Sequence, residues 1–245
     1  MNFHLIKTIH EENNYNALKT TKNKQMKIKA ILFGSTGMIG QGVLRECLAD
    51  QNVEKLLVVN RQSCNIKHPK LREIIHSNMY NLSSIEHEFV DYNACLFCLG
   101  MTSVGMNEQS YHRITYELTL AVAQTLLRVT NEMSFCYISG ASTDSSEKGK
   151  IMWARVKGKT ENALLQLPFK HSFMFRPGYI QPLHGIKSKT KLYNALYIIF
   201  KPFYFILKRF PGIVTDTETL GKAMIKVLTS GYKVNILESK DINTI

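Results

Sequence analysis

A glycine-rich loop between a short apolar run and an amphipathic segment constrains the fold of this chain more than any other feature. The apolar run covers residues 27–33, and apolar residues at helical spacing follow over 38–49. Gly34, Gly37 and Gly40 lie between them in a GxxGxxG arrangement. A buried strand that passes through such a loop directly into a helix is typical of the first unit of a doubly wound α/β fold.

The alternation of strand and helix patterns continues along the chain. Further strands are predicted at 53–60, 71–76, 94–99, 135–138 and 172–175, and helices at 83–89, 107–129 and 151–165. Consecutive strands joined by helices form right-handed crossovers, so the sheet should be parallel and covered by helices on both faces. The sequence therefore predicts an α/β fold of the Rossmann type, with a doubly wound parallel sheet.

The composition divides the chain into three segments. Residues 1–25 are polar and carry no apolar core of a signal peptide, so we expect a disordered extension. Residues 26–178 carry the alternating pattern and are expected to form a dinucleotide-binding Rossmann domain. In residues 179–245 the alternation stops, and an amphipathic helix is expected at 217–229. Ligands of doubly wound folds lie beyond the carboxyl ends of the strands, so this small C-terminal helical region is expected to cover a substrate pocket.

The net charge of +12 is compatible with nucleic acid, an anionic membrane surface or a phosphate-bearing ligand. No run of five like charges and no zinc-finger or RNA-recognition pattern occurs, so a nucleic-acid partner is not expected. Residues 192–207 are apolar and aromatic with flanking lysines, but Lys201 and Pro202 interrupt them. This stretch is too short to span a bilayer; it either packs near the pocket or docks on an anionic membrane surface. The sequence is compatible with either a monomer or an oligomer.

The five cysteines are an odd number without the spacing of a secreted scaffold, which favours reduced thiols in the cytoplasm. The expected location is therefore cytoplasmic, with peripheral membrane docking left open. Cys95 and Cys98 have a metal-like spacing, but they fall on a predicted strand and should point to opposite faces. No metal site is expected.

The loop itself predicts a site for a phosphate-bearing cofactor. Its residues are Gly34, Ser35, Thr36, Gly37, Met38, Ile39 and Gly40. The first glycine permits the tight turn, the second lets the backbone approach a pyrophosphate, and the third allows close packing of helix on strand. The helix N-terminus adds unpaired N–H donors and a favourable dipole. We therefore expect the pyrophosphate of a nicotinamide cofactor here.

The residues at the end of the second strand bear on the kind of nucleotide. A site for NAD(H) favours an acidic residue there, which binds the ribose 2′-hydroxyl. This strand ends in Asn60 and Arg61 instead. A guanidinium can bind a 2′-phosphate through two hydrogen bonds, so NADP(H) is expected in preference to NAD(H). The alternative is that Arg61 is a solvated loop residue.

These motifs resemble the extended and atypical branches of the short-chain dehydrogenase/reductase superfamily. Within that superfamily, residues 27–229 most resemble the NAD-dependent epimerase/dehydratase-like group, which is also described as Tat-interacting-protein-like. The resemblance implies that Leu99 and Gly100 wall the cofactor ribose and that Ser139 lies in the catalytic serine region. It also implies that Arg176, Pro177 and Gly178 form the Arg-Pro-Gly motif beside the cofactor.

The sequence departs from the family at the catalytic tyrosine. Trp153 and Lys157 stand where the resemblance places Tyr-x-x-x-Lys. An indole cannot titrate, whereas Lys157 is retained and is expected to hold the nicotinamide ribose. A proton would then come from another tyrosine such as Tyr179, or through water from Ser139 or Ser142, unless catalysis has been lost.

Two functions follow from this departure. The first is an NADP(H)-dependent oxidoreductase that acts on a small apolar substrate. The second is a non-catalytic protein that binds the dinucleotide as a sensor or scaffold. Trp153 is the residue that separates them.

Overall fold

A central parallel sheet organises the molecule. The computed structural model describes residues 27–187, 204 and 212–245. The strands are β1 (Ile28–Phe33), β2 (Val53–Asn60), β3 (Leu71–Ile75), β4 (Ala94–Phe97), β5 (Ser134–Ile138), β6 (His171–Arg176) and β9 (Ile236–Glu238). They lie in the order β3-β2-β1-β4-β5-β6-β9, with every neighbouring pair parallel. The chain lays β1, β2 and β3 toward one edge of the sheet and then returns to place β4, β5 and β6 on the other side of β1. This strand order is the doubly wound topology, so the predicted Rossmann-type fold is confirmed.

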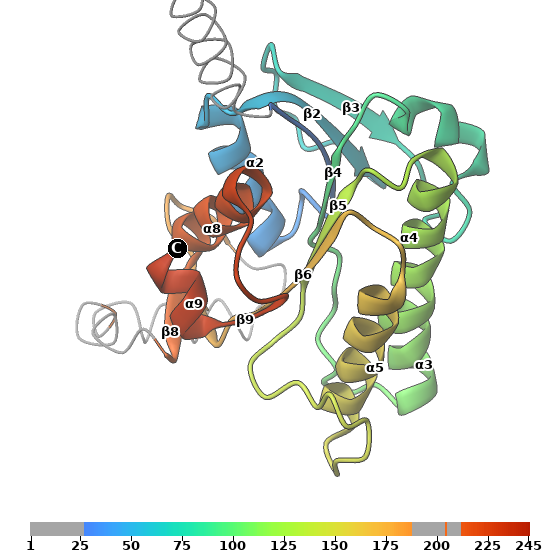
Figure 1. Cartoon of the computed structure of the whole chain (residues 1–245), viewed down its shortest axis with the longest axis vertical. Coiled ribbons are helices and arrows are strands. Elements are labelled where there is room, and N and C mark those ends of the chain that lie inside the picture. The colour runs from blue at the N-terminus through green and yellow to red at the C-terminus, as the bar shows by residue number, and fades with distance from the viewer. Residues whose placement is uncertain (1–26, 188–203, 205–211) are drawn as a thin grey trace, which may run out of the picture.

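Helices cover both faces of this sheet (Figure 1). One face carries α2 (Met38–Ala49), α8 (Thr217–Ser230) and α9 (Ser239–Thr244). The other carries α3 (Glu108–His112), α4 (Leu118–Val129) and α5 (Met152–Gln166), and the 3-10 helix η1 (Ser83–Phe89) follows β3. The predicted helices at 38–49, 83–89, 151–165 and 217–229 therefore form within about a turn of their expected ends.

The sheet separates two apolar cores because successive strand side chains point to opposite faces. Along β1, Ala30 and Leu32 pack on the α2 and α8 side, whereas Ile31 and Phe33 pack on the α4 side. The two cysteines at spacing three divide in the same way. Cys95 belongs to the α4-side core and Cys98 packs against the other. They point to opposite faces, as predicted, and the described residues hold no cluster of three or more metal-binding side chains.

The helix expected at 107–129 is not continuous. A π-helical turn, η2 (Arg113–Glu117), separates α3 from α4. The Thr119 hydroxyl donates to the carbonyl of Thr115 over 2.5 Å, and the Tyr80 hydroxyl donates to that of Arg113 over 3.2 Å. Both hydroxyls thus donate hydrogen bonds to backbone carbonyl groups of η2, whose turn is wider than that of an α-helix. A pattern of apolar spacing does not reveal such a turn, because the flanking helices keep their buried faces.

The C-terminal region is more regular than the sequence indicates. The expectation that strand alternation stops after 178 is wrong, because β9 adds a seventh strand beside β6. With only three residues, β9 is too short to give a periodic signal. β7 (Tyr179–Gln181) and β8 (Val214–Asp216) form a separate two-stranded sheet. Leu220 and Met224 of α8 lie in the same core as β1, so residues from both sides of the predicted boundary at 178 share one core.

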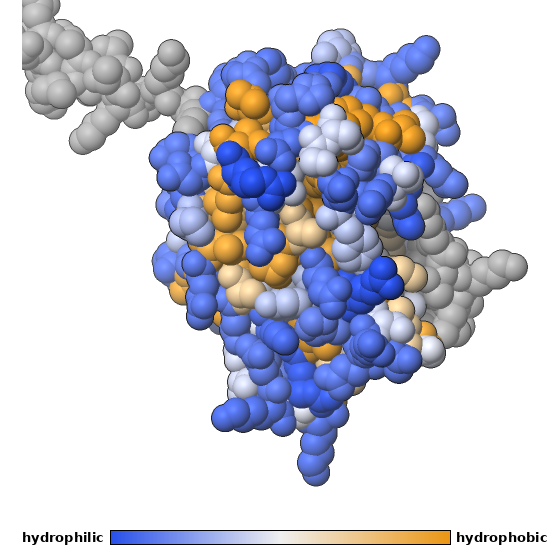
Figure 2. All heavy atoms as spheres, turned by 90° about the vertical axis from the view of Figure 1, so that its right-hand side faces the viewer, coloured by the Kyte–Doolittle hydropathy of each residue, from blue (hydrophilic) through white to orange (hydrophobic). Residues whose placement is uncertain are grey.

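Two expectations lie outside the described part of the chain, namely the disordered extension at 1–25 and, apart from residue 204, the stretch at 192–207 that is expected to pack near the pocket or dock on a membrane. Of the helices that the structure describes, none is long and apolar enough to cross a bilayer. The side of the molecule next to α4 and α5 shows a band of apolar residues between hydrophilic areas (Figure 2).

Candidate functional site

Two glycines of the loop after β1 are required by the fold itself. Gly34 has a φ of +85°, and a Cβ there would lie 2.8 Å from backbone atoms of Cys98 and Leu99. A Cβ on Gly40 would lie 2.0 Å from the carbonyl oxygen of Gly34. A side chain at either position would push β1, β4 and α2 apart. Their packing roles are those expected for the first and third glycines of the motif.

Gly37 differs from both of them. It is the N-cap of α2 with a φ of −81°, which any residue adopts, and no side chain caps the helix there. A Cβ on Gly37 would meet only the Gly34 carbonyl oxygen, at 3.4 Å. The protein therefore leaves space at this position, next to the N-terminus of α2, where the first N–H groups of a helix have no partner within the helix. A pyrophosphate fits both features, since it needs a close backbone approach and N–H donors.

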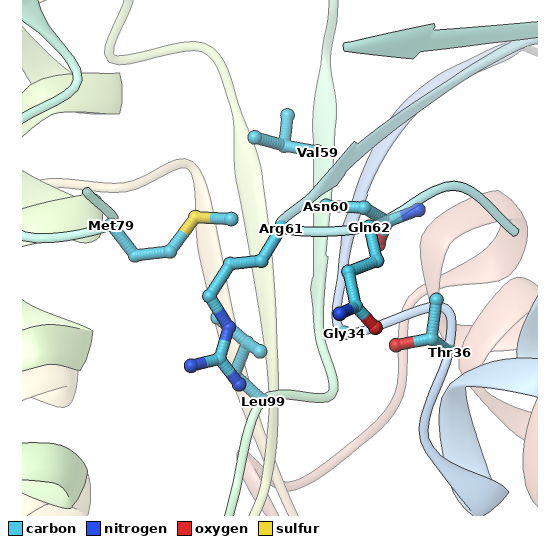
Figure 3. A pocket seen from close by; sticks show the side chains of 8 residues that line it. All are labelled: Gly34, Thr36, Val59, Asn60, Arg61, Gln62, Met79 and Leu99. Atoms are coloured by element: carbon cyan, nitrogen blue, oxygen red, sulfur yellow. The ribbon is translucent and has the colours of Figure 1, made fainter. Parts of the chain in front are cut away.

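A pocket of about 360 Å³ lies beside this loop at the carboxyl ends of β1 and β2. Its lining consists of Gly34, Thr36, Val59, Asn60, Arg61, Gln62, Met79 and Leu99. Figure 3 shows the Arg61 side chain reaching across the pocket toward Leu99, with Gln62 turned toward Thr36. Gly34, Thr36, Arg61 and Leu99 are sequence-predicted site residues, and the structure brings them together.

Sequence reasoning missed other lining residues, including Gln62 and Met79. Met79 comes shortly after β3, whose carboxyl end lies at the same sheet edge as the glycine loop. That position was the available signal, because ligands of doubly wound sheets bind at this edge. Asn60, at the place where an NAD site favours a carboxylate, is 3% exposed and accepts a hydrogen bond from the Ser35 hydroxyl over 2.9 Å.

Ser139 lies directly after β5, at the same edge of the sheet. Its backbone N–H donates to Phe175 over 2.7 Å, and its Oγ lies 3.0 Å from that of Thr143. The Thr143 hydroxyl donates to the Gly140 carbonyl over 2.8 Å, so in this arrangement Ser139 donates to Thr143. The remaining lone pairs of the Ser139 hydroxyl can accept a hydrogen bond. Ser142 is exposed with a φ of +66°, in the turn that follows.

Lys157 and Trp153, from α5, meet the end of β5. The Lys157 Nζ donates to the carbonyl oxygens of Ile138 and Ser139, each over 3.2 Å. Loss of solvent around the ammonium lowers the pKa of Lys157 to about 8, although the charge of Glu161 opposes this shift. A Cβ on Gly140 would lie 3.8 Å from Cζ3 of Trp153. The three predicted catalytic residues, Ser139, Trp153 and Lys157, are thus gathered at one strand end.

Tyr179 lies in β7, and its hydroxyl donates to Oε1 of Gln181 over 2.8 Å. The structure therefore commits this phenol proton to a neighbour in the small sheet. Ser139, Thr143 and Lys157 each carry exchangeable protons and contact the loop beside Trp153.

The Arg176, Pro177 and Gly178 motif makes contacts that brace the loops around the site. Arg176 pairs with Glu161 and Glu238, and its Nη2 donates to the Ser145 hydroxyl over 2.5 Å. Pro177 accepts a hydrogen bond from Ala141 over 2.9 Å. A Cβ on Gly178 would lie 2.2 Å from the carbonyl oxygen of Ile213. Cofactor contacts of this motif, and of the exposed Gly100, stay predictions.

No family model matches the chain. Among curated proteins it is similar to protein fmp52-2, mitochondrial, of Aspergillus terreus, at 24% identity over 68% of this chain and 72% of that one. It is similar to protein FMP52, mitochondrial, of Meyerozyma guilliermondii at 24% identity over 62% and 65%. It also resembles rat protein HTATIP2, at 22% identity over 66% and 67%. The names of the FMP52 relatives contradict the cytoplasmic location expected from the cysteines, which is therefore corrected.

Solved structures with related folds include the Bordetella bronchiseptica enzyme WbmF in complex with NAD+. Its TM-score is 0.63 at 14% identity, over 91% of this chain and 78% of that one. A short chain dehydrogenase family protein from Francisella tularensis has a TM-score of 0.61 at 14% identity, over 86% and 96%. These likenesses confirm the fold that the motifs predicted. The chain thus has the Rossmann-type fold of the solved proteins that it resembles, which include a short chain dehydrogenase family protein and an enzyme crystallised with NAD+.

Proposed function

We propose that this protein is an NADP(H)-dependent oxidoreductase that reduces a small apolar carbonyl compound. The observation that carries the proposal is the ammonium group of Lys157, which the carbonyl oxygens of Ile138 and Ser139 hold at the carboxyl end of β5. A cationic donor at this edge of a doubly wound sheet lies where ligands of such folds bind.

The choice of NADP(H) is supported by the pocket beside the glycine loop. Arg61 lines it, and no described residue forms an ion pair with its guanidinium. The strand end carries Asn60 where an NAD site favours a carboxylate. A 2′-phosphate would receive two charge-assisted hydrogen bonds from Arg61. The N–H groups at the start of α2 would hold the pyrophosphate next to Gly37.

The chemistry of reduction needs a proton as well as a hydride. NADPH bound here would supply a hydride, and the carbonyl oxygen of the substrate would need a proton from this chain's own residues. Trp153 cannot release one, because its indole N–H does not titrate. Two of the three N–H bonds of Lys157 point at backbone carbonyls, which leaves one for the substrate oxygen.

A pKa of about 8 suits Lys157 to this transfer near neutral pH. The amine that remains regains its proton from solvent. The Ser139 hydroxyl, which donates to Thr143, has lone pairs that can accept a hydrogen bond from a water molecule beside Lys157.

The second candidate is a protein that binds the dinucleotide without turnover. The observation that favours it is Trp153, whose ring lies beside Gly140 where the resemblance expects a tyrosine. Names of the FMP52 relatives support a mitochondrial location for either candidate.

The cofactor assignment is tested by titrating the protein with NADPH and NADH. Trp153 is the only tryptophan of the chain, so its emission reports binding next to it. NADPH should bind more tightly, and Arg61→Ala should narrow the difference. Arg128→Ala, which removes an exposed guanidinium paired with Glu86, is the matched control and should change neither affinity. Equal affinities in the unmodified protein would contradict the choice of NADP(H).

A further inference from the structure

The carboxylate of Glu73, in β3, fastens both ends of the loop that carries Arg61 and Gln62. Its Oε1 accepts hydrogen bonds from Nδ2 of Asn60 over 2.9 Å and from the backbone N–H of Cys64 over 2.8 Å. Its Oε2 accepts one from the Ser63 hydroxyl over 2.6 Å. Asn60 precedes the two pocket residues, and Ser63 and Cys64 follow them. The loop is therefore held on both sides by one side chain.

The charge state of Glu73 strengthens these contacts. Partial burial raises its pKa, but the hydrogen bonds from Ser63, Cys64 and Asn60 outweigh burial and leave the pKa below its usual value. An ionised carboxylate makes stronger hydrogen bonds than a neutral acceptor. The Glu73 carboxylate already accepts three hydrogen bonds from the loop. Its role is therefore to hold the loop in place beside the pocket.

The same network reaches the glycine loop. Since the Asn60 amide N–H₂ is turned to Glu73, its Oδ1 faces Ser35 and accepts the hydroxyl proton over 2.9 Å. Asn60 and Ser35 are 3% and 0% exposed, so the amide has little freedom to turn over. Glu73 thus fixes the loop bearing Arg61 relative to the loop expected to hold the pyrophosphate.

We propose that Glu73 is a positioning residue that sets the preference between NADPH and NADH by holding Arg61 across the pocket. This inference rests on the proposed NADP(H) function. In Figure 3 Arg61 extends toward Leu99, while its neighbour Gln62 turns the other way. A loop whose backbone is fixed in advance loses less conformational freedom when Arg61 binds a phosphate, so NADPH gains affinity and NADH does not.

The experiment compares dissociation constants for NADPH and NADH in Glu73→Gln, Arg61→Ala, the double variant and the unmodified protein. Glu73→Gln keeps the size of the side chain but removes the charge. It should weaken NADPH binding about tenfold, the scale of one charge-assisted contact, and NADH binding less than about twofold. Glu54→Gln, an exposed carboxylate at the other end of β2, is the matched control and should change neither. Ser63→Ala, which removes one of the three donors, should shift the ratio in the same direction by less.

The double variant separates positioning from a direct effect. If Glu73 acts through Arg61, the NADPH to NADH ratio of the double variant should equal that of Arg61→Ala alone. Melting temperatures identify variants that fail to fold, in which case Ser63→Ala carries the test. An NADPH to NADH preference that is unchanged in Glu73→Gln, or an equal loss of affinity for both cofactors, would overturn the inference and leave the proposed function standing. Equal binding of both cofactors by the unmodified protein would overturn both.

Discussion

Glu161 and Arg176 form an ion pair in which the carboxylate is completely buried and the guanidinium side chain is 11% exposed. The Nε of Arg176 lies 3.0 Å and 3.1 Å from the two carboxylate oxygens. Glu161 is one helical turn beyond Lys157 on α5, and Arg176 ends β6. The pair therefore joins the helix that carries the candidate proton donor to the strand beside it.

Removing the guanidinium should destabilise the protein strongly. Arg176→Met leaves Glu161 buried without its partner, and breaking a buried pair in this way costs about 3–5 kcal/mol of unfolding free energy. Chemical denaturation measures the loss. Arg176→Met combined with Glu161→Leu should recover much of it, because no buried charge remains. A loss below about 1 kcal/mol in the single variant would show that water reaches Glu161.

Reduction should depend on the protonation of Lys157. The donor is the ammonium form, which is populated below a pKa of about 8 and lost as the pH rises through that value. The turnover number should therefore fall above about pH 8. Glu161→Gln should move this fall to lower pH, because the charge of Glu161 raises the pKa of Lys157. A profile that is flat from pH 6 to about pH 10, beyond the lowered pKa, would remove Lys157 as the donor.

Substitutions at Gly37 and Gly40 should affect cofactor binding and protein stability differently. Gly37→Val should abolish binding of both dinucleotides with little change in melting temperature, because the fold leaves space there. Gly40→Ala should instead lower the melting temperature, since its Cβ would lie 2.0 Å from Gly34. Calorimetric melting and cofactor titration on both variants make the comparison. Unchanged cofactor affinity in Gly37→Val would place the pyrophosphate elsewhere.

The sequence predicts the parts of this fold that depend on local pattern. The strand, loop and helix around Gly34 carry strong periodic signals, and so do the elements up to β6. The three-residue β9 is not predicted, because it is stabilised by pairing with β6, a strand distant in sequence. The π-helical turn at 113–117 is not predicted, because the apolar spacing there matches that of an ordinary α-helix.

The candidate site divides in a similar way. Ser139, Trp153 and Lys157 are found by motif, and the structure brings them together. The Glu73 network is not predicted, because its donors lie 9, 10 and 13 residues away and meet it only through the pairing of β2 with β3. The cytoplasmic expectation failed because cysteine usage reports the redox state of a compartment and does not distinguish the cytoplasm from other reducing ones.

Turnover of NADPH with a panel of small apolar carbonyl compounds tests the central claim most directly. The unmodified protein should oxidise NADPH slowly, Lys157→Ala should be inactive, and Trp153→Phe should keep activity. Trp153→Tyr should be faster by about 10²- to 10⁴-fold, because a phenol next to Lys157 adds general acid catalysis. Cofactor binding without turnover of any compound in the unmodified protein would contradict the account and favour the non-catalytic alternative. Turnover that persists in Lys157→Ala would place the active site elsewhere.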